Sequence, residues 1–461
     1  MYIIIIIIII IIMKIISNYK EIIDLVHGTI KLSDIATKII DTPYFQRLRY
    51  IKQLGVCYLV YPNAIHTRFE HSIGTYYLAG RLLNSIKKNS DNISLSHDLV
   101  IPELDNYYMR TYRDRVHIKL DDYVCELIKI AALCHDIGHG PFSHMFDDIF
   151  INNYKKIHSK HEVRSGLILE YIINSDEHLS NIIKDPEITF MKNLIDPQKH
   201  HTSFIYQIVS NIVTQIDVDK LDYISRDIKM LGLNIKFDPY KFVDDIKVFN
   251  NFICYPEDMK DNIIELFKIR YRLNKQIYSD KIVTVFKHMM KDIMINMDPI
   301  LNIHESIKNF DHFIKMTDNY VISCLLYINS SKLIIKELLS PNISRAYTLW
   351  DNINNRKIYK FINTIYTHEQ LSPTIDRRLE LAHIKSDNII IDISRVSFFG
   401  NIKYNINPKD NIYLFDNKDR IKKAEFDDSL DTNEYIYTII SKNNHDHHTN
   451  DKIFDLTDKI Q

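Results

Sequence analysis

The chain contains little glycine and cysteine and has almost no net charge, and the low cysteine content and net charge exclude some classes of protein. It has only 9 glycines among 461 residues, where an average composition would supply about 32. Five cysteines with no Cys-X-X-Cys pair exclude a disulfide scaffold and a structural zinc site, and they favour an intracellular protein. Lys and Arg number 58 against 59 for Asp and Glu, a net charge of −1, so nucleic-acid binding would need a local basic patch.

The sequence also lacks an apolar run long enough to cross a bilayer. The longest run, residues 2–13, contains ten consecutive isoleucines and would measure about 18 Å as a helix, against a hydrocarbon core of about 30 Å. No charged side chain precedes it and no small-residue cleavage site follows it, unlike a signal peptide. We therefore expect residues 1–16 to be a low-complexity extension, with an anchor to a membrane or a partner as the alternative.

What the sequence does contain is the balance of a globular protein, with 46% hydrophobic and 25% charged residues. Apolar residues recur at helical spacing over 122–134, 204–227 and 257–296. Pro102 interrupts this rhythm, so residues 98–119 are expected to form a loop or hairpin.

The character of the sequence changes after about residue 300. Residues 388–399 and 411–415 are rich in β-branched and aromatic side chains, which predicts strands. The expected fold class is mainly α, with a helical core over residues 17–300 and a small mixed α/β lobe over 301–442. Residues 443–461 are expected to be a polar, solvated tail.

Histidine is abundant where glycine is scarce, and five of the 21 histidines fall within residues 135–161. Buried imidazoles and carboxylates are costly unless they bind something, and a divalent metal ion would satisfy several together. The adjacent pair His135-Asp136 can supply two ligands but cannot surround an ion. His71 begins another helix and faces inward, and Asp219 lies on a third predicted helix. This set of nitrogen and oxygen ligands suits Fe, Mn, Mg or a catalytic Zn.

These residues bring the sequence close to a known family. The pattern His71, His135-Asp136, Asp219 resembles the ligands of the HD superfamily of metal-dependent phosphohydrolases. Longer strings narrow the resemblance to deoxynucleoside triphosphate (dNTP) triphosphohydrolases of the sterile-alpha-motif-and-HD-domain type, from about Lys20 to Asn319 and without a sterile-alpha-motif domain. The strings are Ile40-Asp41-Thr-Pro-Tyr-Phe-Gln46-Arg47-Leu-Arg49, His66-Thr-Arg68-Phe-Glu70-His71, Cys134-His-Asp-Ile-Gly-His-Gly-Pro-Phe-Ser-His-Met-Phe-Asp147 and Ile216-Asp-Val-Asp-Lys-Leu-Asp-Tyr-Ile-Ser-Arg-Asp227.

The resemblance implies that residues 17–300 form an HD-domain core and that its polar residues divide into a metal shell and a reacting shell. The implied metal ligands are His71, His135, Asp136 and Asp219, and the implied reacting residues are His139, His144, Asp147 and His161. Cleavage at the α-phosphorus needs protonation of the leaving 5′-oxygen, a task suited to histidine. We expect His144 to be the general acid, oriented by His161 and Asp147.

The resemblance also implies how a dNTP substrate is held. Arg68, Lys220 and Arg270 correspond to phosphate contacts. Leu54 and Tyr278 would leave no room for a 2′-hydroxyl. The 3′-hydroxyl would bond to Gln53 and Asp227, with Tyr223 beside them.

A guanine-nucleotide activator and a homo-oligomer, dimer or tetramer, are further implications of the resemblance. The first activator site would comprise Lys20, Asp41, Gln46 and Arg49, and would bind GTP or dGTP. The adjoining deoxynucleotide site looks poorly kept, because it has Pro256, Asp258, Gln276 and Asp280 where basic groups are expected.

The leading interpretation is metal-dependent hydrolysis of dNTPs to deoxynucleoside and triphosphate. One alternative is an HD phosphodiesterase or nuclease that acts on cyclic nucleotides or nucleic acid. Another is a nucleotide-binding or RNA-binding scaffold without turnover.

Overall fold

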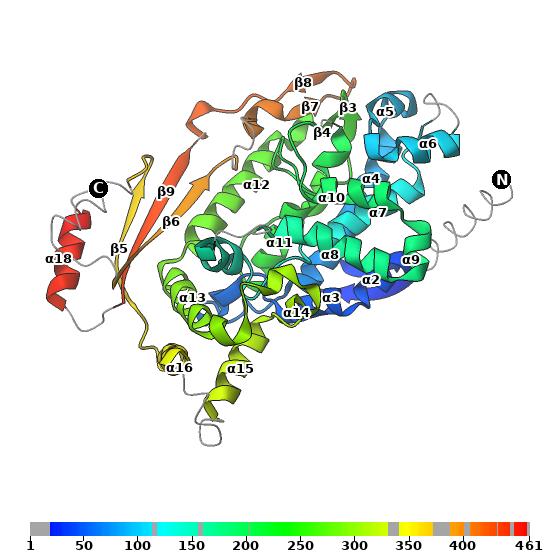
Figure 1. Ribbon diagram of the computed structural model, residues 1–461. Coiled ribbons are helices and arrows are strands. Elements are labelled where there is room, and N and C mark those ends of the chain that lie inside the picture. The colour runs from blue at the N-terminus through cyan, green and yellow to red at the C-terminus, as the bar shows by residue number, and fades with distance from the viewer. Residues whose placement is uncertain are drawn as a thin grey trace.

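The computed structural model describes residues 19–112, 118–154, 160–201, 203–330, 341–371, 388–400, 406–430, 432–442 and 447–458. The expected mainly α fold is confirmed, with small sheets gathered mostly in the C-terminal part (Figure 1). The extension expected at residues 1–16 lies outside the described residues. Among the described residues, no helix combines the length and the apolar character needed to cross a membrane.

The centre of the molecule is a group of packed helices that holds His71, the His135-Asp136 pair and Asp219. Helix α4 (Arg68–Asn89) packs against α7 (Asp122–Cys134) and α11 (Val218–Met230), while α10 (Asp185–Ile195) packs against α7 and α8 (His161–Ser175). Local signals start these helices: Thr67 and Glu70 form a capping box on α4, and Asp121 and Asp217 cap α7 and α11. The predicted helix over residues 122–134 is confirmed.

The N-terminal end of the described chain is a hairpin that leads into this group. Strand β1 (Tyr19–Asp24) pairs antiparallel with β2 (Gly28–Ser33), which is followed by the short helices α2 (Asp34–Ile40) and α3 (Pro43–Gln46). Ile30 and Leu32 are fully buried. The hairpin is therefore anchored to the core through β2.

Two stretches in the first half of the chain differ from the predicted secondary structure. The loop or hairpin expected at 98–119 is wrong over 102–112, because Pro102 begins a 3-10 turn that leads into α6 (Asp105–Tyr112). The helix expected over 204–227 is interrupted between a 3-10 turn (Phe204–Gln207) and α11. Here the side chain of Asn211 accepts bonds from the backbone N–H groups of Val213 and Thr214 in place of a helical ladder.

The long stretch at 257–296 also divides. Helix α12 (Lys260–Leu273) runs into a π-helical turn (Asn274–Tyr278), after which α13 (Lys281–Leu301) begins. Asp280 separates the two helices because its side chain caps α13, accepting bonds from the N–H groups of Ile282 and Val283 at 2.8 and 2.9 Å.

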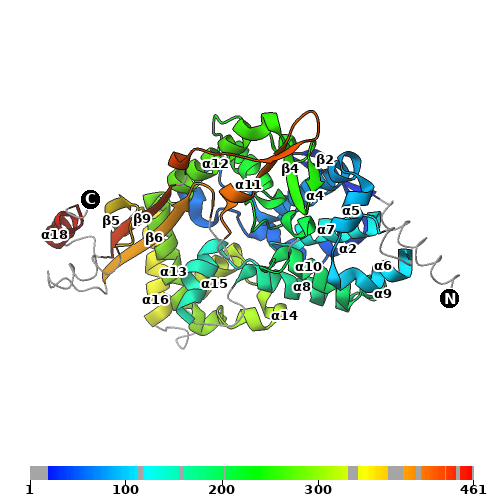
Figure 2. The same cartoon turned by 90° about the horizontal axis from the view of Figure 1, so that it is seen from above.

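The C-terminal lobe is built on an antiparallel three-stranded sheet. Its order is β5 (Lys360–Thr367), β9 (Asn433–Ser441), β6 (Ile389–Ser397), so the strand predicted at 388–399 is confirmed. Helices α15 (Asp318–Ser330) and α16 (Pro341–Asn354) pack on α13 beside it. Figures 1 and 2 both place this sheet at one side of the helical core.

A second sheet joins the two parts of the chain. Strand β4 (Phe252–Pro256) pairs antiparallel with β3 (Lys247–Phe249) and parallel with β7 (Tyr413–Phe415), which pairs with β8 (Ile421–Lys423). The predicted strand at 411–415 is thus β7. It belongs to a sheet shared with residues before 300, so the division at residue 300 remains a prediction.

The solvated tail expected at 443–461 is wrong over residues 447–458, which form helix α18 (His447–Asp458). This helix packs on β5, and Ile453 is fully buried against the sheet. The polar composition concealed this packing, because a few apolar side chains on one face suffice to dock a short helix.

Candidate metal centre and active site

The four residues expected to bind a metal ion meet between three helices. His71 lies near the start of α4, His135 and Asp136 follow α7, and Asp219 lies in the first turn of α11. His71 Nε2 lies 3.3 Å from His135 Nε2, 3.4 Å from Asp136 Oδ2 and 3.2 Å from Asp219 Oδ1. Ligand atoms about 2.1 Å from a tetrahedral ion stand about 3.4 Å apart, so each of these separations matches two ligands on one divalent ion. His71, His135 and Asp136 have ligand atoms that all lie within 4.8 Å of one another, and Asp219 Oδ1 lies within 3.3 Å of both histidines.

The other ring nitrogen of each histidine fixes its orientation. His71 Nδ1 lies 2.7 Å from Asp222 Oδ2, and His135 Nδ1 lies 2.7 Å from the carbonyl oxygen of Ala132. A carboxylate and a carbonyl accept hydrogen bonds, so both rings donate from Nδ1. Each Nε2 then keeps its lone pair for a metal ion.

The carboxylate of Asp136 is held in its charged form. Arg68 pairs with it through Nη1, and both side chains are buried. Although burial opposes ionisation, Arg68 and the neighbouring histidines hold the pKa of Asp136 well below its usual range. Arg68 Nε also donates to Ser143 Oγ at 2.8 Å. The arginine therefore connects the ligand to the loop that carries the reacting residues.

The four residues expected to react lie together beside the metal ligands. The rings of His139 and His161 are stacked with centroids 3.8 Å apart, and His144 stands edge-on to both. His161 Nδ1 bonds to Asp147 Oδ2 at 3.0 Å, and the other oxygen of Asp147 accepts from Arg164. Neither ring nitrogen of the buried His139 has a hydrogen-bond partner among the described residues, although Nε2 lies 3.3 Å from Asp136 Oδ1.

A strained loop presents His144 to this group. Phe142 and Ser143, the two residues before it, have positive φ angles of 62° and 60°, a conformation that costs side-chain-bearing residues free energy. Asp318, at the start of α15, accepts the N–H of Phe142 at 2.6 Å and that of Lys52 at 3.1 Å. A Cβ on Gly55 would lie 2.6 Å from the Phe142 carbonyl oxygen, so only glycine allows this close approach.

The three histidines of the reacting group also present nitrogens within 4.8 Å of one another, a second arrangement that could hold an ion. Its electrostatics disfavour a cation. Burial and the positive charges of Arg68 and His161 hold the pKa of His139 well below its usual value. The same positive potential would repel a metal ion there.

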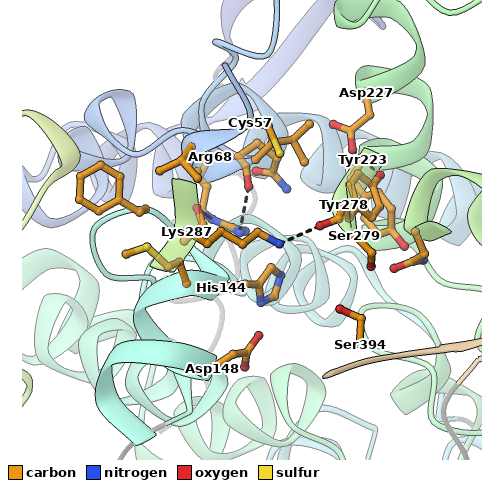
Figure 3. A pocket seen from close by; sticks show the side chains of 18 of the residues that line it. Cys57, Arg68, His144, Asp148, Tyr223, Asp227, Tyr278, Ser279, Lys287 and Ser394 are labelled. Carbon is orange, nitrogen blue, oxygen red and sulfur yellow. Dashed lines mark hydrogen bonds between the residues drawn. The ribbon is translucent and has the colours of Figure 1, made fainter. Parts of the chain in front are cut away.

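A cavity of about 490 Å³ opens beside the reacting residues, a size suited to a small ligand (Figure 3). Seven residues expected to contact substrate or to react line it: Gln53, Leu54, Arg68, His144, Tyr223, Asp227 and Tyr278. Tyr278 OH donates to Asp227 Oδ2 at 2.5 Å, and His66 Nε2 lies 2.7 Å from Asp227 Oδ1. These contacts fix one wall of the cavity.

Two of the three expected phosphate contacts do not line the cavity. Lys220 Nζ is paired with Asp217 Oδ2 at 2.6 Å, within the first turn of α11. Arg270 lies under Gly400, where a Cβ would come within 2.7 Å of its Nη1. That Nη1 atom is buried and has no hydrogen-bond partner among the described residues.

Sequence reasoning missed several residues of the site. Lys287 from α13 and Ser394 and Arg395 from β6 line the cavity, and Lys287 Nζ donates to the carbonyl oxygen of Tyr278 at 2.7 Å. No local pattern indicates that the C-terminal sheet reaches the cavity. Asp222, in contrast, could have been found, because it lies three residues after Asp219 on the same helix face.

The four residues of the expected activator site occupy one surface region near the N-terminal hairpin. Lys20 Nζ lies 3.4 Å from Asp41 Oδ2, and both side chains are exposed. Arg49 Nε donates to Gln46 Oε1 at 2.8 Å, and its guanidinium lies 3.4 Å from the ring centroid of Phe69.

The residues of the expected second activator site are divided. Pro256 and Asp258 line a surface hollow of about 860 Å³, whereas Asp280 caps α13 and Gln276 lies in the π-helical turn. The hollow also contains basic groups from other elements, namely Lys241, Lys418 and Arg420. Arg420 is already paired with Asp416 at 2.6 Å.

The helical fold and the His, His-Asp, Asp ligand set define an HD-domain protein, and the family model for the HD domain matches residues 68–225. The chain is 39% identical to the HD domain-containing protein L394 of Acanthamoeba polyphaga mimivirus, over 85% of this chain and 84% of that protein. It is 31% identical to the deoxynucleoside triphosphate triphosphohydrolase SAMHD1 of Bos taurus, over 87% of this chain and 70% of that protein. It is 33% identical to the deoxynucleoside triphosphate triphosphohydrolase SAMHD1 homolog of Dictyostelium discoideum, over 88% of this chain and 70% of that protein. The chain belongs to the family of HD-domain deoxynucleoside triphosphate triphosphohydrolases.

Proposed function

We propose that this protein hydrolyses dNTPs to deoxynucleoside and inorganic triphosphate with the help of a divalent metal ion. The observation that carries the proposal is that Nε2 of His71 and of His135 lie 3.3 Å apart and that each lies 3.2–3.5 Å from an oxygen of Asp136 and of Asp219, beside a histidine group and a nucleotide-sized cavity. A bound ion supplies a Lewis acid for the phosphoryl oxygens.

Two cationic or proton-bearing groups of the chain act on the phosphates. Arg68, which lines the cavity while it holds Asp136, brings positive charge to the triphosphate. His144 also lines the cavity and donates a proton to the leaving 5′-oxygen. Asp147 and His161, joined by their 3.0 Å bond, orient the neighbouring rings.

The sugar is selected at the wall formed by Leu54 and Tyr278. The Tyr278 ring cannot move toward solvent without breaking its hydrogen bond to Asp227. This bond holds Tyr278 beside Leu54, and the two side chains together are called the sugar gate. Gln53 and Asp227 bind the 3′-hydroxyl, with Tyr223 beside them. An added 2′-hydroxyl would meet apolar and aromatic surface without a partner.

Lys220 and Arg270 complete phosphate binding after a local rearrangement. Lys220 exchanges its bond with Asp217 for a phosphate oxygen, and the unpaired Nη1 of Arg270 supplies a second cation. A charge-assisted bond from Lys220 to phosphate offsets the loss of this pair, and the buried Asp217 keeps the backbone N–H groups of Asn211 and Lys220 as donors.

We also propose that a guanine nucleotide activates the protein and that the protein assembles into a dimer or tetramer. The exposed pair Lys20–Asp41 can separate easily, because such surface pairs contribute about 1 kcal/mol or less. Asp41 and Gln46 would then read a guanine edge while Lys20 and Arg49 bind phosphate. The five free cysteines support an intracellular location.

The test is to incubate the protein with each of the four dNTPs and Mn²⁺ and to separate the products by anion-exchange chromatography. The proposal predicts equal amounts of deoxynucleoside and triphosphate. Release of pyrophosphate or single phosphates would contradict it. Cleavage of cyclic nucleotides or oligonucleotides without cleavage of dNTPs would favour the phosphodiesterase or nuclease alternative, and binding without turnover would favour the scaffold.

A further inference from the structure

The turn of the N-terminal hairpin is built to point a histidine into the core. Asp24 Oδ1 accepts the backbone N–H groups of Val26 and His27, each at 2.8 Å, and Gly28 completes the turn with a φ of +73°. The side chain of His27 is fully buried. A turn at the end of an exposed hairpin has no need of such a residue unless it makes a specific contact inside.

That contact is with Asp222, the carboxylate that orients metal ligand His71. His27 Nε2 lies 2.7 Å from Asp222 Oδ1, while His71 Nδ1 lies 2.7 Å from Asp222 Oδ2. The other nitrogen of His27 lies 3.1 Å from the hydroxyl of Tyr240. One buried carboxylate therefore bridges an imidazole of the hairpin and an imidazole of the metal centre.

A second connection leads from the same turn to the same carboxylate. Arg226 donates to both oxygens of Asp222, at 2.9 and 3.0 Å, and its Nη1 donates to Asp24 Oδ2 at 2.8 Å. Both acidic side chains and the guanidinium are at most 3% exposed. Gly74 leaves room for this arrangement, since a Cβ there would lie 1.8 Å from Asp222 Oδ1.

We propose that His27 and Asp24 are positioning residues for the metal centre, acting through Asp222 on His71. The inference rests on the proposed metal site and adds a role for a segment far from it in sequence. A carboxylate held by donors on both oxygens cannot rotate, so it keeps His71 Nε2 aimed at the other ligands. Groups that orient a metal ligand typically change metal affinity about 10–100-fold when they are removed.

The experiment measures Mn²⁺ affinity of the chelator-treated full chain, by the electron paramagnetic resonance signal of free Mn²⁺. His27→Leu removes the donor to Asp222 and should raise the Mn²⁺ dissociation constant about 10–100-fold. Asp24→Asn keeps an acceptor for the turn but presents an NH₂ group to Arg226, so it should raise the constant about tenfold. Melting curves of the metal-free proteins show that each variant is folded.

His288→Leu is the matched control, because His288 is also buried and bonds to an aspartate, Asp392, at 2.8 Å. It should leave Mn²⁺ affinity unchanged. If H27L does not fold, D24N decides. Folded variants with wild-type Mn²⁺ affinity would overturn the inference, whereas a wild-type chain that binds no Mn²⁺ would refute the metal site itself.

Discussion

The imidazole ring of His161 stacks on that of His139, with 3.8 Å between ring centroids and 21° between the ring planes. Two positive charges on stacked rings repel each other, so protonation of both rings is unfavourable. The surroundings of the two rings shift their pKa values in different directions. Although burial opposes it, Glu162 and Asp147 raise the pKa of His161. Burial, Arg68 and His161 hold that of His139 well below its usual value. The two surroundings therefore shift the two pKa values in opposite directions, so a proton is favoured on His161 over His139, next to the ring of His144.

Asp147 should control catalysis without controlling metal binding. Replacing it by Asn removes the charge that favours protonated His161 and weakens the contact with Arg164. We expect Asp147→Asn to lower kcat roughly 100-fold, at the low end of acid–base contributions, with little change in KM. Steady-state kinetics with a dNTP and a parallel Mn²⁺ titration test this. A variant that loses Mn²⁺ binding in proportion to its activity would show that Asp147 serves the ion instead.

Leu54 should exclude ribonucleotides by filling space. The wild-type protein should hydrolyse dATP far better than ATP, because a filled pocket rejects an added hydroxyl more strongly than the roughly 100-fold achieved by an open apolar one. Leu54→Ala should raise the relative kcat/KM for ATP. Ile393→Ala, which alters an apolar side chain of the same cavity on β6, serves as the control and should leave the ratio unchanged. Similar values for dATP and ATP in the wild type would refute the sugar gate.

Asp318 should stabilise the loop that presents His144. Asp318→Asn retains one acceptor oxygen but leaves either the N–H of Phe142 or that of Lys52 without a partner. An unsatisfied buried donor costs about 1–3 kcal/mol, and urea unfolding should show a loss of stability of this size together with reduced kcat. Wild-type stability and wild-type kcat would mean that the positive φ angles of Phe142 and Ser143 are maintained by other contacts.

Assembly should depend little on a second deoxynucleotide. In the hollow near β4, the carboxylate of Asp258 would repel a triphosphate, and Pro256 stands where a cation is expected. Arg420, which also lines the hollow, is already paired with Asp416. Light scattering across a titration with GTP and a dNTP should show that the dNTP does not change the oligomeric state, because the oligomer is either constitutive or no larger than a dimer. A tetramer that forms only when both nucleotides are present would contradict this expectation.

Local chemistry in the sequence was enough to predict α7 and to indicate that the His135-Asp136 pair at its end could bind a metal ion. Asp121 caps the helix, and the His-Asp pair at its end is too costly to bury without a ligand. The grouping of metal ligands and of reacting residues depended on the resemblance, and the structure brings the members of each of these two groups together.

Contacts between distant segments could not be predicted in the same way. The bond from His27 to Asp222 joins residues 195 positions apart, and β6 reaches the cavity only because the C-terminal sheet packs beside α13. Lys220 and Arg270 have the right charge, yet their side chains turn to Asp217 and to Gly400. Helix α18 formed in a segment whose composition predicted a solvated tail. Tertiary packing decided each of these outcomes.

An ion held by His71, His135, Asp136 and Asp219 should be the one that catalysis requires. The most direct test is to measure metal content and dNTP turnover on the same preparations of the wild-type protein and the double variant His135→Ala/Asp136→Ala. The wild-type protein should contain bound metal and turn over dNTPs, whereas the folded double variant should lose the metal, with turnover reduced by several orders of magnitude. Unchanged metal content and turnover in that variant would show that these residues do not hold the catalytic ion.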